Sequence, residues 1–211
     1  MSSSESAVEH ALDTSFFQRW LTAAAESVHR EATRLTELDS AIGDADHGTN
    51  MQRGFTAVTE ALEKEPPGSP GAALILAGRQ LISKVGGASG PLYGTLLRRA
   101  GKALGDAAEV TPQQLADALR AGVDAVAQLG GAAPGDKTML DALLPAVEAL
   151  GGDTASFTAA GEAADKGALA TVPMLARKGR ASYLGERSVG HQDPGATSSA
   201  LIVTALAEAV R

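Results

Sequence analysis

The chain has 211 residues, and 18 lysines and arginines against 25 aspartates and glutamates give it a formal net charge of −7. This acidity argues against nucleic-acid binding and against binding to anionic membranes, because both favour basic surfaces. The lack of cysteine excludes disulfides, thiolate zinc sites and iron–sulfur clusters. The polar N-terminus is unlike a signal peptide, and no apolar run approaches the roughly 20 residues of a membrane span. We therefore expect a cytoplasmic, globular, single-domain protein.

Alanine and leucine are abundant and no segment alternates apolar and polar residues as a strand would, so the chain is predicted to be all-α. Helical periodicity predicts eight helices, over 14–39, 50–64, 72–84, 91–104, from Thr111 onward, 139–150, 156–169 and 196–210. The fifth opens with a capping box of Thr111 and Gln114. Residues 1–12 are predicted to be a poorly ordered extension, and residues 13–211 the folded domain.

The connections between the predicted helices are of two kinds. The second, fourth and sixth, at 66–70, 105–111 and 151–154, are plain turns. The odd-numbered connections are rich in glycine and in polar or charged residues, and they lie at 42–49, 85–90, 130–138 and 171–195. In an up-down arrangement all odd connections lie at one end, together with the N-termini of every second helix. Because helix N-termini attract anions, this end is predicted to form a phosphate-binding rim.

The first of these loops contains a candidate metal site. Asp44 and Asp46 flank a single residue, so in extended backbone their side chains point the same way, and Asp39 can reach toward them. Three carboxylates this close repel one another unless they share a cation, and oxygen ligands favour Mg²⁺ or Ca²⁺. The alternative is that these aspartates only cap helices and turn the loop. Taken alone, His47 fits a structural histidine as well as a ligand.

The remaining odd loops are individually ambiguous. The glycines of 85–90 could bring backbone amides near a phosphate or simply allow a helix–helix turn. The loop 130–138 superficially resembles a Walker A loop, but Asp136 separates the glycine from the lysine and no strand precedes it. The long connection 171–195 carries a cationic cluster, which suits a phosphate partner but also fits a solvated loop. The cluster consists of Arg177, Lys178, Arg180 and Arg187.

Several ordered strings of residues nevertheless resemble one known family. They lie at 43–48 (GDADHG), 86–91 (GGASGP), 134–138 (PGDKT), 177–187 (RKGRASYLGER) and 190–196 (GHQDPGA). Together they resemble the ADP-binding L subunits of bacterial dihydroxyacetone kinases of the phosphotransferase-linked type. The resemblance extends from about Phe16 to the C-terminus, so it covers the predicted domain.

The resemblance implies a fold and a set of site residues. The fold is an eight-helix up-down barrel with the nucleotide at one rim. Asp39, Asp44 and Asp46 would hold two Mg²⁺ ions that bridge the phosphates of ADP or ATP. The expected nucleotide-lining residues are His47, Gly48, Thr49, Asn50, Ala88, Ser89, Gly130, Thr138 and Met139. Arg180 would act catalytically on the transferring phosphoryl group, and Arg180, Asp193, Pro194 and Gly195 would close over the site. We expect the segment 171–195 to be a lid that also contributes to subunit docking.

The resemblance also implies partners. In the phosphotransferase-linked version, a phosphocarrier subunit recharges bound ADP to ATP. The phosphoryl group then passes to dihydroxyacetone held on a histidine of a K-type subunit, which gives dihydroxyacetone phosphate. A transcriptional regulator is a further expected partner. Three alternatives stay open: a homologue that uses free ATP on another small ketose, an ADP–Mg sensor module, and a Mg-dependent phosphohydrolase.

Overall fold

A computed structural model describes residues 11–151 and 156–210, and over these ranges the protein is almost entirely helical. The helices are α1 (Thr14–Ile42), α2 (His47–Lys64), α3 (Pro70–Lys84), α4 (Ser89–Leu104), α5 (Pro112–Gly130), α6 (Leu140–Ala149), α7 (Ser156–Ala170) and α8 (Pro194–Ala209), with a 3-10 helix, η1 (Arg180–Ser188). The all-α class is therefore confirmed. Most of the predicted extension, residues 1–10, lies outside the described residues.

Two short strands were not predicted. Strand β1 (Leu12–Asp13) pairs antiparallel with β2 (Glu109–Val110), and Leu12 is opposite Val110. Both of these apolar side chains are buried, so the pair covers one end of the core. Two residues per strand are too few to produce a visible alternation in the sequence.

Each helix packs against the next along the chain, and α8 packs against α1, α6 and α7. Trp20 of α1 and Tyr93 of α4 are among the largest fully buried side chains. The indole of Trp20 donates a hydrogen bond from Nε1 to the Ile202 carbonyl at 2.8 Å, which links the first helix to the last. Among the described residues, no helix is both long and apolar enough to cross a membrane.

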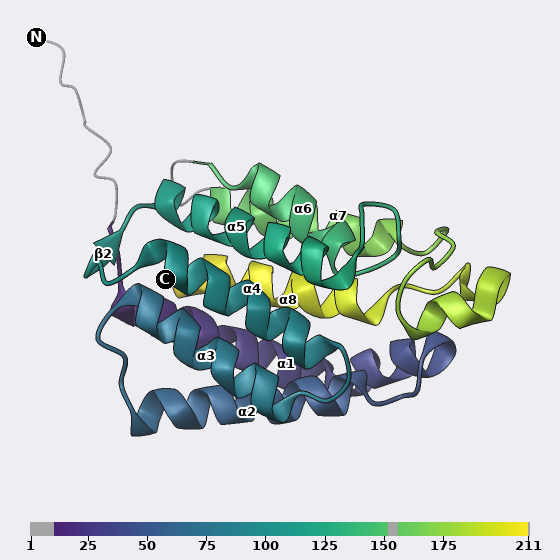
Figure 1. The fold of residues 1–211 in the computed structure, drawn as a ribbon, viewed down its shortest axis with the longest axis horizontal. Helices are drawn as coiled ribbons and strands as arrows, with labels where there is room; N and C mark the ends of the chain where they lie inside the picture. The colour runs from purple at the N-terminus through teal and green to yellow at the C-terminus, as the bar shows by residue number, and fades with distance from the viewer. Residues whose placement is uncertain (1–10, 152–155, 211) are drawn as a thin grey trace, which may run out of the picture.

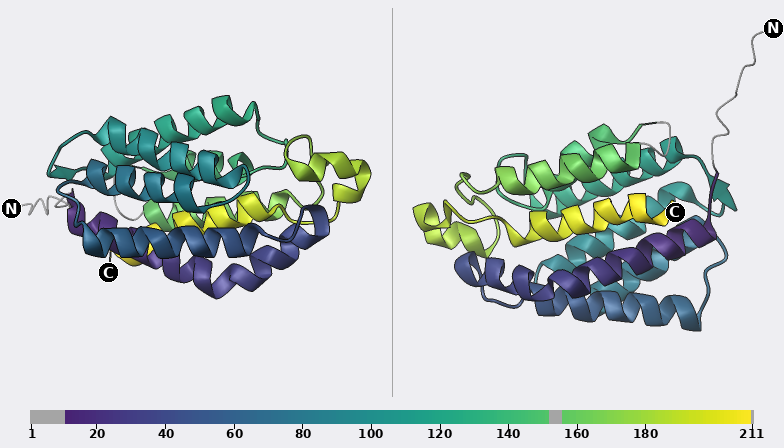
Figure 2. Two further views of the ribbon diagram at one scale, coloured as in Figure 1. Left: turned by 60° about the horizontal axis from the view of Figure 1, so that its bottom comes forward. Right: turned by 180° about the vertical axis from the view of Figure 1, so that it is seen from behind.

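The helices run back and forth, so the odd-numbered connections gather at one end of the molecule (Figures 1 and 2). The described C-terminal end of α8 and the β1–β2 pair lie at the opposite end. This placement follows from the up-down order of the helices, and it confirms the prediction that four unusual connections share a rim. The loop ends differ in detail: α2 begins at His47 and α4 at Ser89, so residues assigned to loops form first helical turns.

The segment 171–195 is more ordered than its sequence indicates. Instead of a structureless loop, it contains η1, with a kink at Gly185 where φ is +56°. The Gly190 amide donates to the Val172 carbonyl at 2.8 Å, and the Ala176 amide donates to Ser188 Oγ at 3.0 Å. The helical periodicity did not predict η1. Its glycines interrupt every helical pattern, and the fixing bonds come from positions distant in sequence.

Candidate functional site

The three aspartates of the predicted metal site come together. Asp39 lies on the last turns of α1, and one oxygen atom from each of Asp39, Asp44 and Asp46 lies within 4.8 Å of the others. Asp39 is buried, and its Oδ2 accepts hydrogen bonds from the backbone amides of Asp46 at 2.9 Å and His47 at 3.1 Å. The carboxylate at the end of α1 thus folds the following loop back onto itself.

The cluster does not form in the way the sequence suggested. Ala45 has φ +61°, so the backbone between Asp44 and Asp46 is left-handed rather than extended. Gly43 is needed beside it, because a Cβ there would lie 2.1 Å from Asp39 Oδ1. The expected side-by-side placement of two carboxylates on an extended chain is therefore wrong, although the three carboxylates do converge.

This donor set fits a divalent cation. One oxygen atom from each of the three carboxylates is close enough to the others to bind the same ion, and Asp44 and Asp46 are exposed. Such hard oxygen ligands suit Mg²⁺ or Ca²⁺. The guanidinium of Arg180 lies next to them, with its Nη2 3.0 Å from Asp44 Oδ2. Without a cation, this exposed arginine offsets part of the repulsion among the carboxylates.

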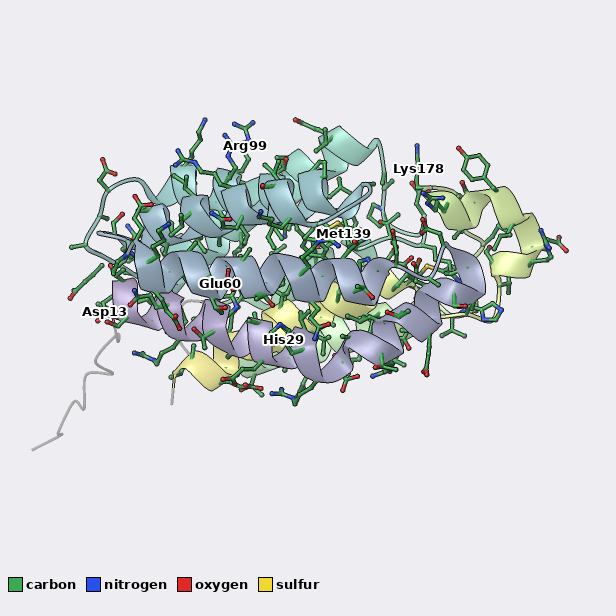
Figure 3. All side chains as sticks on the ribbon, turned by 90° about the horizontal axis from the view of Figure 1, so that it is seen from below. Asp13, His29, Glu60, Arg99, Met139 and Lys178 are labelled. Atoms are coloured by element: carbon green, nitrogen blue, oxygen red, sulfur yellow. The ribbon has the colours of Figure 1, made fainter. Side chains whose placement is uncertain are left out.

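A cavity of about 290 Å³ adjoins the carboxylates, a volume near the lower end for small-molecule sites. The predicted residues that line it are Asp39, Asp44, Asp46, His47, Asn50, Ala88, Ser89, Gly130, Thr138, Met139, Arg180, Asp193, Pro194 and Gly195. Its apolar wall is supplied by Leu92, Val126, Ala132, Met139 and Leu140. Figure 3 shows Met139 within the helical assembly and Lys178 beside η1.

The cavity thus has two chemically different regions. The carboxylates and Arg180 provide charge, and the first turn of α4, at Ser89, provides backbone N–H groups that have no partner within the helix. The opposite region is aliphatic. A ligand with an anionic part and a flat or apolar part matches this division, and a nucleotide has both.

Two predicted residues, Gly48 and Thr49, do not line the cavity. Thr49 is exposed on α2, whereas Gly48 is buried against α1. A Cβ on Gly48 would lie 1.9 Å from the Ala32 carbonyl oxygen. Gly48 therefore permits the close approach of α1 and α2 that brings Asp39 to the loop.

We expect Gly48→Ala to lower the free energy of unfolding by about 1–3 kcal/mol, since a rigid backbone atom occupies the space that the methyl group needs. Urea unfolding followed by circular dichroism measures this change. Gly68→Ala is the matched control, because nothing lies within 4 Å of a Cβ at Gly68. Equal stability of the two variants would contradict the proposed close contact.

His47 belongs to a buried hydrogen-bond network. Its Nε2 is 2.8 Å from Ser198 Oγ and its Nδ1 is 3.3 Å from Ser89 Oγ. Ser198 Oγ is in turn 2.6 Å from the hydroxyl of Tyr93, which also donates to the Gly195 carbonyl at 3.0 Å. Burial lowers the pKa of His47, although Asp39 and Asp46 act in the opposite direction. The network ties the first turns of α2, α4 and α8 together around the cavity.

Sequence reasoning missed two organising residues, Lys137 and Asp141. The buried carboxylate of Asp141 accepts from the Gly135 amide at 2.6 Å and from the Thr138 amide at 2.8 Å, which fixes the loop before α6. An acidic residue in the first turn of a helix was the available signal for Asp141. Lys137 was noticed in an incomplete Walker A pattern and in the string at 134–138, and its fully buried side chain could not be inferred from either.

Asp193 is the N-cap of α8, and its Oδ2 accepts from the Ala196 amide at 2.7 Å. Burial raises the pKa of Asp193 from 3.8 to about 7, with smaller opposing effects from the Ala196 amide and from Lys137. Between about pH 4 and pH 7 the folded protein therefore keeps a proton that the unfolded chain has released. The contribution of Asp193 to the free energy of unfolding falls as the pH rises through this range.

Asp193→Asn is expected to remove that part of the pH dependence while keeping an oxygen acceptor at the N-cap. The measurement is urea unfolding of nucleotide-free and metal-free protein at pH 5 and pH 7.5. The substitution should stabilise the protein more at pH 7.5 than at pH 5, relative to wild type. The same stability difference at both values would contradict a raised pKa.

Comparisons with known proteins agree with this geometry. Residues 41–208 match the DAK2 domain. The chain is 46% identical over 199 residues to the ADP-binding subunit DhaL of the PEP-dependent dihydroxyacetone kinase of Escherichia coli (strain K12), which covers 91% of this chain and 95% of that subunit. It is 41% identical to L-erythrulose 1-kinase of Mycolicibacterium smegmatis, over 82% of this chain but only 32% of the kinase.

A solved structure shows the same fold. The crystal structure of the dihydroxyacetone kinase from C. freundii in complex with AMP-PNP and Mg²⁺ superposes with a TM-score of 0.71 and 27% sequence identity. The similarity covers 99% of this chain and 36% of that one. The chain therefore spans about a third of the length of the two larger kinases.

Proposed function

Because this chain belongs to the DAK2 domain family, we propose that it is the ADP-binding subunit of a dihydroxyacetone kinase. It holds ADP or ATP with Mg²⁺ and passes a phosphoryl group from a phosphocarrier subunit to dihydroxyacetone held on a K-type subunit. The product is dihydroxyacetone phosphate. The observation that carries this proposal is one cavity that combines three converging carboxylates, Arg180 and an aliphatic wall.

Phosphoryl transfer depends mainly on positioning and on neutralisation of charge in a loose transition state. Asp39, Asp44 and Asp46 would hold the metal, and bound Mg²⁺ supplies charge neutralisation at the phosphate oxygens. The free N–H groups in the first turn of α4 contribute further positive potential. Arg180 lies where it can contact a phosphate that binds beside Asp44.

The acceptor and its base belong to another subunit in this proposal. His47 is the one histidine among the described residues that line the cavity. Hydrogen bonds to Ser198 and Ser89 occupy both nitrogen atoms of its imidazole. It is therefore poorly suited to take a proton from a sugar hydroxyl. The chain supplies the nucleotide half of an active site, and its partner has to approach the cavity rim.

The first test is release of nucleotide from the purified protein. Denatured protein should release ADP into the supernatant, which supports a nucleotide held as a coenzyme. Purified protein should then transfer phosphate to dihydroxyacetone only when K-type and phosphocarrier subunits are both present. Turnover of ATP by the chain alone would instead identify a phosphohydrolase, and transfer from free ATP would exclude the phosphocarrier as the required donor.

The matches to erythrulose kinases favour one specific alternative, a relative that serves another small ketose. This alternative concerns the partner, because no part of the cavity in this chain has to contact the ketone. Assays with dihydroxyacetone and erythrulose and the same K-type subunit separate the two substrates. A binding assay with a transcriptional regulator, performed with and without ADP–Mg, tests the sensor role.

Binding of ADP–Mg is expected to raise the melting temperature, since a ligand that binds only the folded state stabilises it by mass action. At a free ligand concentration of 100 times Kd the gain is about 2.7 kcal/mol. For a protein of this size this corresponds to roughly 5–10 °C. Differential scanning fluorimetry measures the shift, and ADP with EDTA is the control. A shift of equal size in EDTA would contradict metal-dependent binding.

A further inference from the structure

Lys137 is a lysine without exposure to water, since only 1% of its surface is accessible. Lysine is rarely buried so completely, because its ammonium group loses hydration. Here Nζ donates to three backbone carbonyls: Met174 at 3.1 Å, Ser188 at 2.7 Å and His191 at 2.5 Å. An ammonium group has three N–H donors, so none remains for a phosphate. Lys137 therefore does not act as the lysine of a Walker A loop would.

All three acceptors belong to the segment 171–195, in which Met174 lies 14 residues before Ser188 and 17 before His191. The ammonium group thus binds three parts of the segment at one point: its beginning at Met174, the end of η1 at Ser188, and His191 before α8. A further bond joins the same two regions, from the Arg177 amide to the Asp136 carbonyl at 3.1 Å. Lys178 and Arg180, on this segment, line the cavity.

The loop that carries Lys137 is also constrained. Lys137 has φ +63°, a conformation that a residue with a side chain keeps only where its surroundings impose it. The next two residues, Thr138 and Met139, line the aliphatic part of the cavity. Asp141 holds the amides of Gly135 and Thr138 on either side of Lys137. The loop that carries Lys137 is therefore a fixed support rather than a mobile connection.

We propose that Lys137 is a positioning residue: its buried ammonium fastens the segment 171–195 to the loop before α6 and so sets the place of Arg180 over the cavity. The bond network by itself supports the fastening, while the effect on phosphoryl transfer rests on the proposed function. The dipoles of the three carbonyls compensate the buried positive charge. Removal of the ammonium frees three carbonyls at once, which releases the segment without touching Arg180.

The first experiment needs neither nucleotide nor partner subunits. Hydrogen–deuterium exchange is measured for the amides of Ala176, Arg177 and Gly190 in wild type and in Lys137→Met. Exchange at these amides should rise by at least about tenfold, while the core amides of α1 and α8 stay protected. Lys166→Met, an exposed lysine on α7, is the matched control and should change nothing. Unchanged exchange in Lys137→Met would overturn the anchor.

A second variant covers the case in which Lys137→Met does not fold. Lys137→Gln keeps a polar side chain but removes the charge and leaves two side-chain N–H donors in place of three. It should raise exchange at the amides of Ala176, Arg177 and Gly190 by a smaller factor than Lys137→Met. Wild-type protection of these amides in Lys137→Gln would overturn the anchor.

The second experiment is a double-mutant cycle on phosphoryl transfer with saturating partner subunits. Misplacement of a catalytic group can reduce a rate by about a hundredfold, so Lys137→Met should lower kcat on that scale and change the KM for the K-type partner little. In an Arg180→Ala background, Lys137→Met should lower kcat no further, because its effect passes through Arg180. If the effects of Lys137→Met and Arg180→Ala on kcat were fully additive, the positioning role would be overturned. If Lys137→Met loses protection but the wild type itself transfers no phosphate, the anchor stands and only the proposed function is contradicted.

Discussion

Asp44→Ala and Asp46→Ala should each abolish retention of ADP while leaving the helical far-UV spectrum unchanged. Each substitution removes one of three oxygen ligands that lie within 4.8 Å of one another. Residues that merely support metal ligands change metal affinity by about 10- to 100-fold when replaced, so loss of a ligand should weaken Mg-dependent binding by about 100-fold or more. Equilibrium dialysis with ADP and Mg²⁺ measures the affinity, and EDTA should reproduce the loss in wild type.

Asp106→Ala is the matched control, because Asp106 is an exposed aspartate at the opposite end, between α4 and β2. Its affinity for ADP–Mg should equal that of wild type. Asp39→Ala is a less informative variant, since Asp39 also accepts two backbone hydrogen bonds and its loss is expected to disturb the loop itself. Wild-type retention of ADP in both Asp44→Ala and Asp46→Ala would refute the metal site.

Arg180→Ala should reduce the rate of phosphoryl transfer by about 2–4 kcal/mol, the range seen when one group that stabilises transition-state charge is removed. Arg180 is exposed and pairs with Asp44 across the entrance of the cavity. A solvated arginine of this kind contributes under about 0.5 kcal/mol to stability, so the melting temperature should barely change. Transfer to dihydroxyacetone is measured with saturating K-type and phosphocarrier subunits.

Arg187→Ala provides the control, since Arg187 belongs to the same 3-10 helix but does not line the cavity. It should transfer phosphate at the wild-type rate. A rate of Arg180→Ala within about twofold of wild type, roughly 0.4 kcal/mol, would remove the segment 171–195 from the catalytic machinery. A large loss in both variants would point to docking of a partner rather than to contact with phosphate.

The two expectations together separate binding from transfer. The carboxylates are needed to hold the nucleotide at all, whereas Arg180 should act mainly while charge develops on the transferring group. Asp44 belongs to both sets because its carboxylate contacts Arg180. Asp46→Ala is therefore the cleaner test of metal binding, and Arg180→Ala is the cleaner test of transfer.

The segment 171–195, which is predicted to act as a lid, is held in place by several hydrogen bonds. Lys137, Ser188 and the Val172–Gly190 backbone bond fix it at several points. Any closing movement would have to pivot around these points rather than reorder the whole segment. Tyr183, on η1, is 88% exposed. Its exposure suits a role in subunit docking, which stays a prediction.

The sequence by itself determined the helical class, the approximate positions of the eight α-helices in the described ranges and the end of the molecule that carries the candidate site. These features depend on local information: the 3.6-residue periodicity, the cap at Thr111 and the parity of an up-down chain. It also identified the three aspartates, and the resemblance to the kinase family supplied about half of the residues that line the cavity. Those residue types are grouped within single connections, so they stay close together wherever the connection lies.

Only the tertiary structure decided how those residues are held. Asp39 reaches the loop because α1 extends to Ile42 and Gly48 lets α2 approach it closely. Ala45 is left-handed because the loop closes on Asp39, which reverses the extended geometry that the spacing indicated. Lys137 is buried because the segment 171–195 folds over it and supplies three carbonyls from distant positions. Such contacts join residues far apart along the chain, and their energy depends on a geometry that no local pattern encodes.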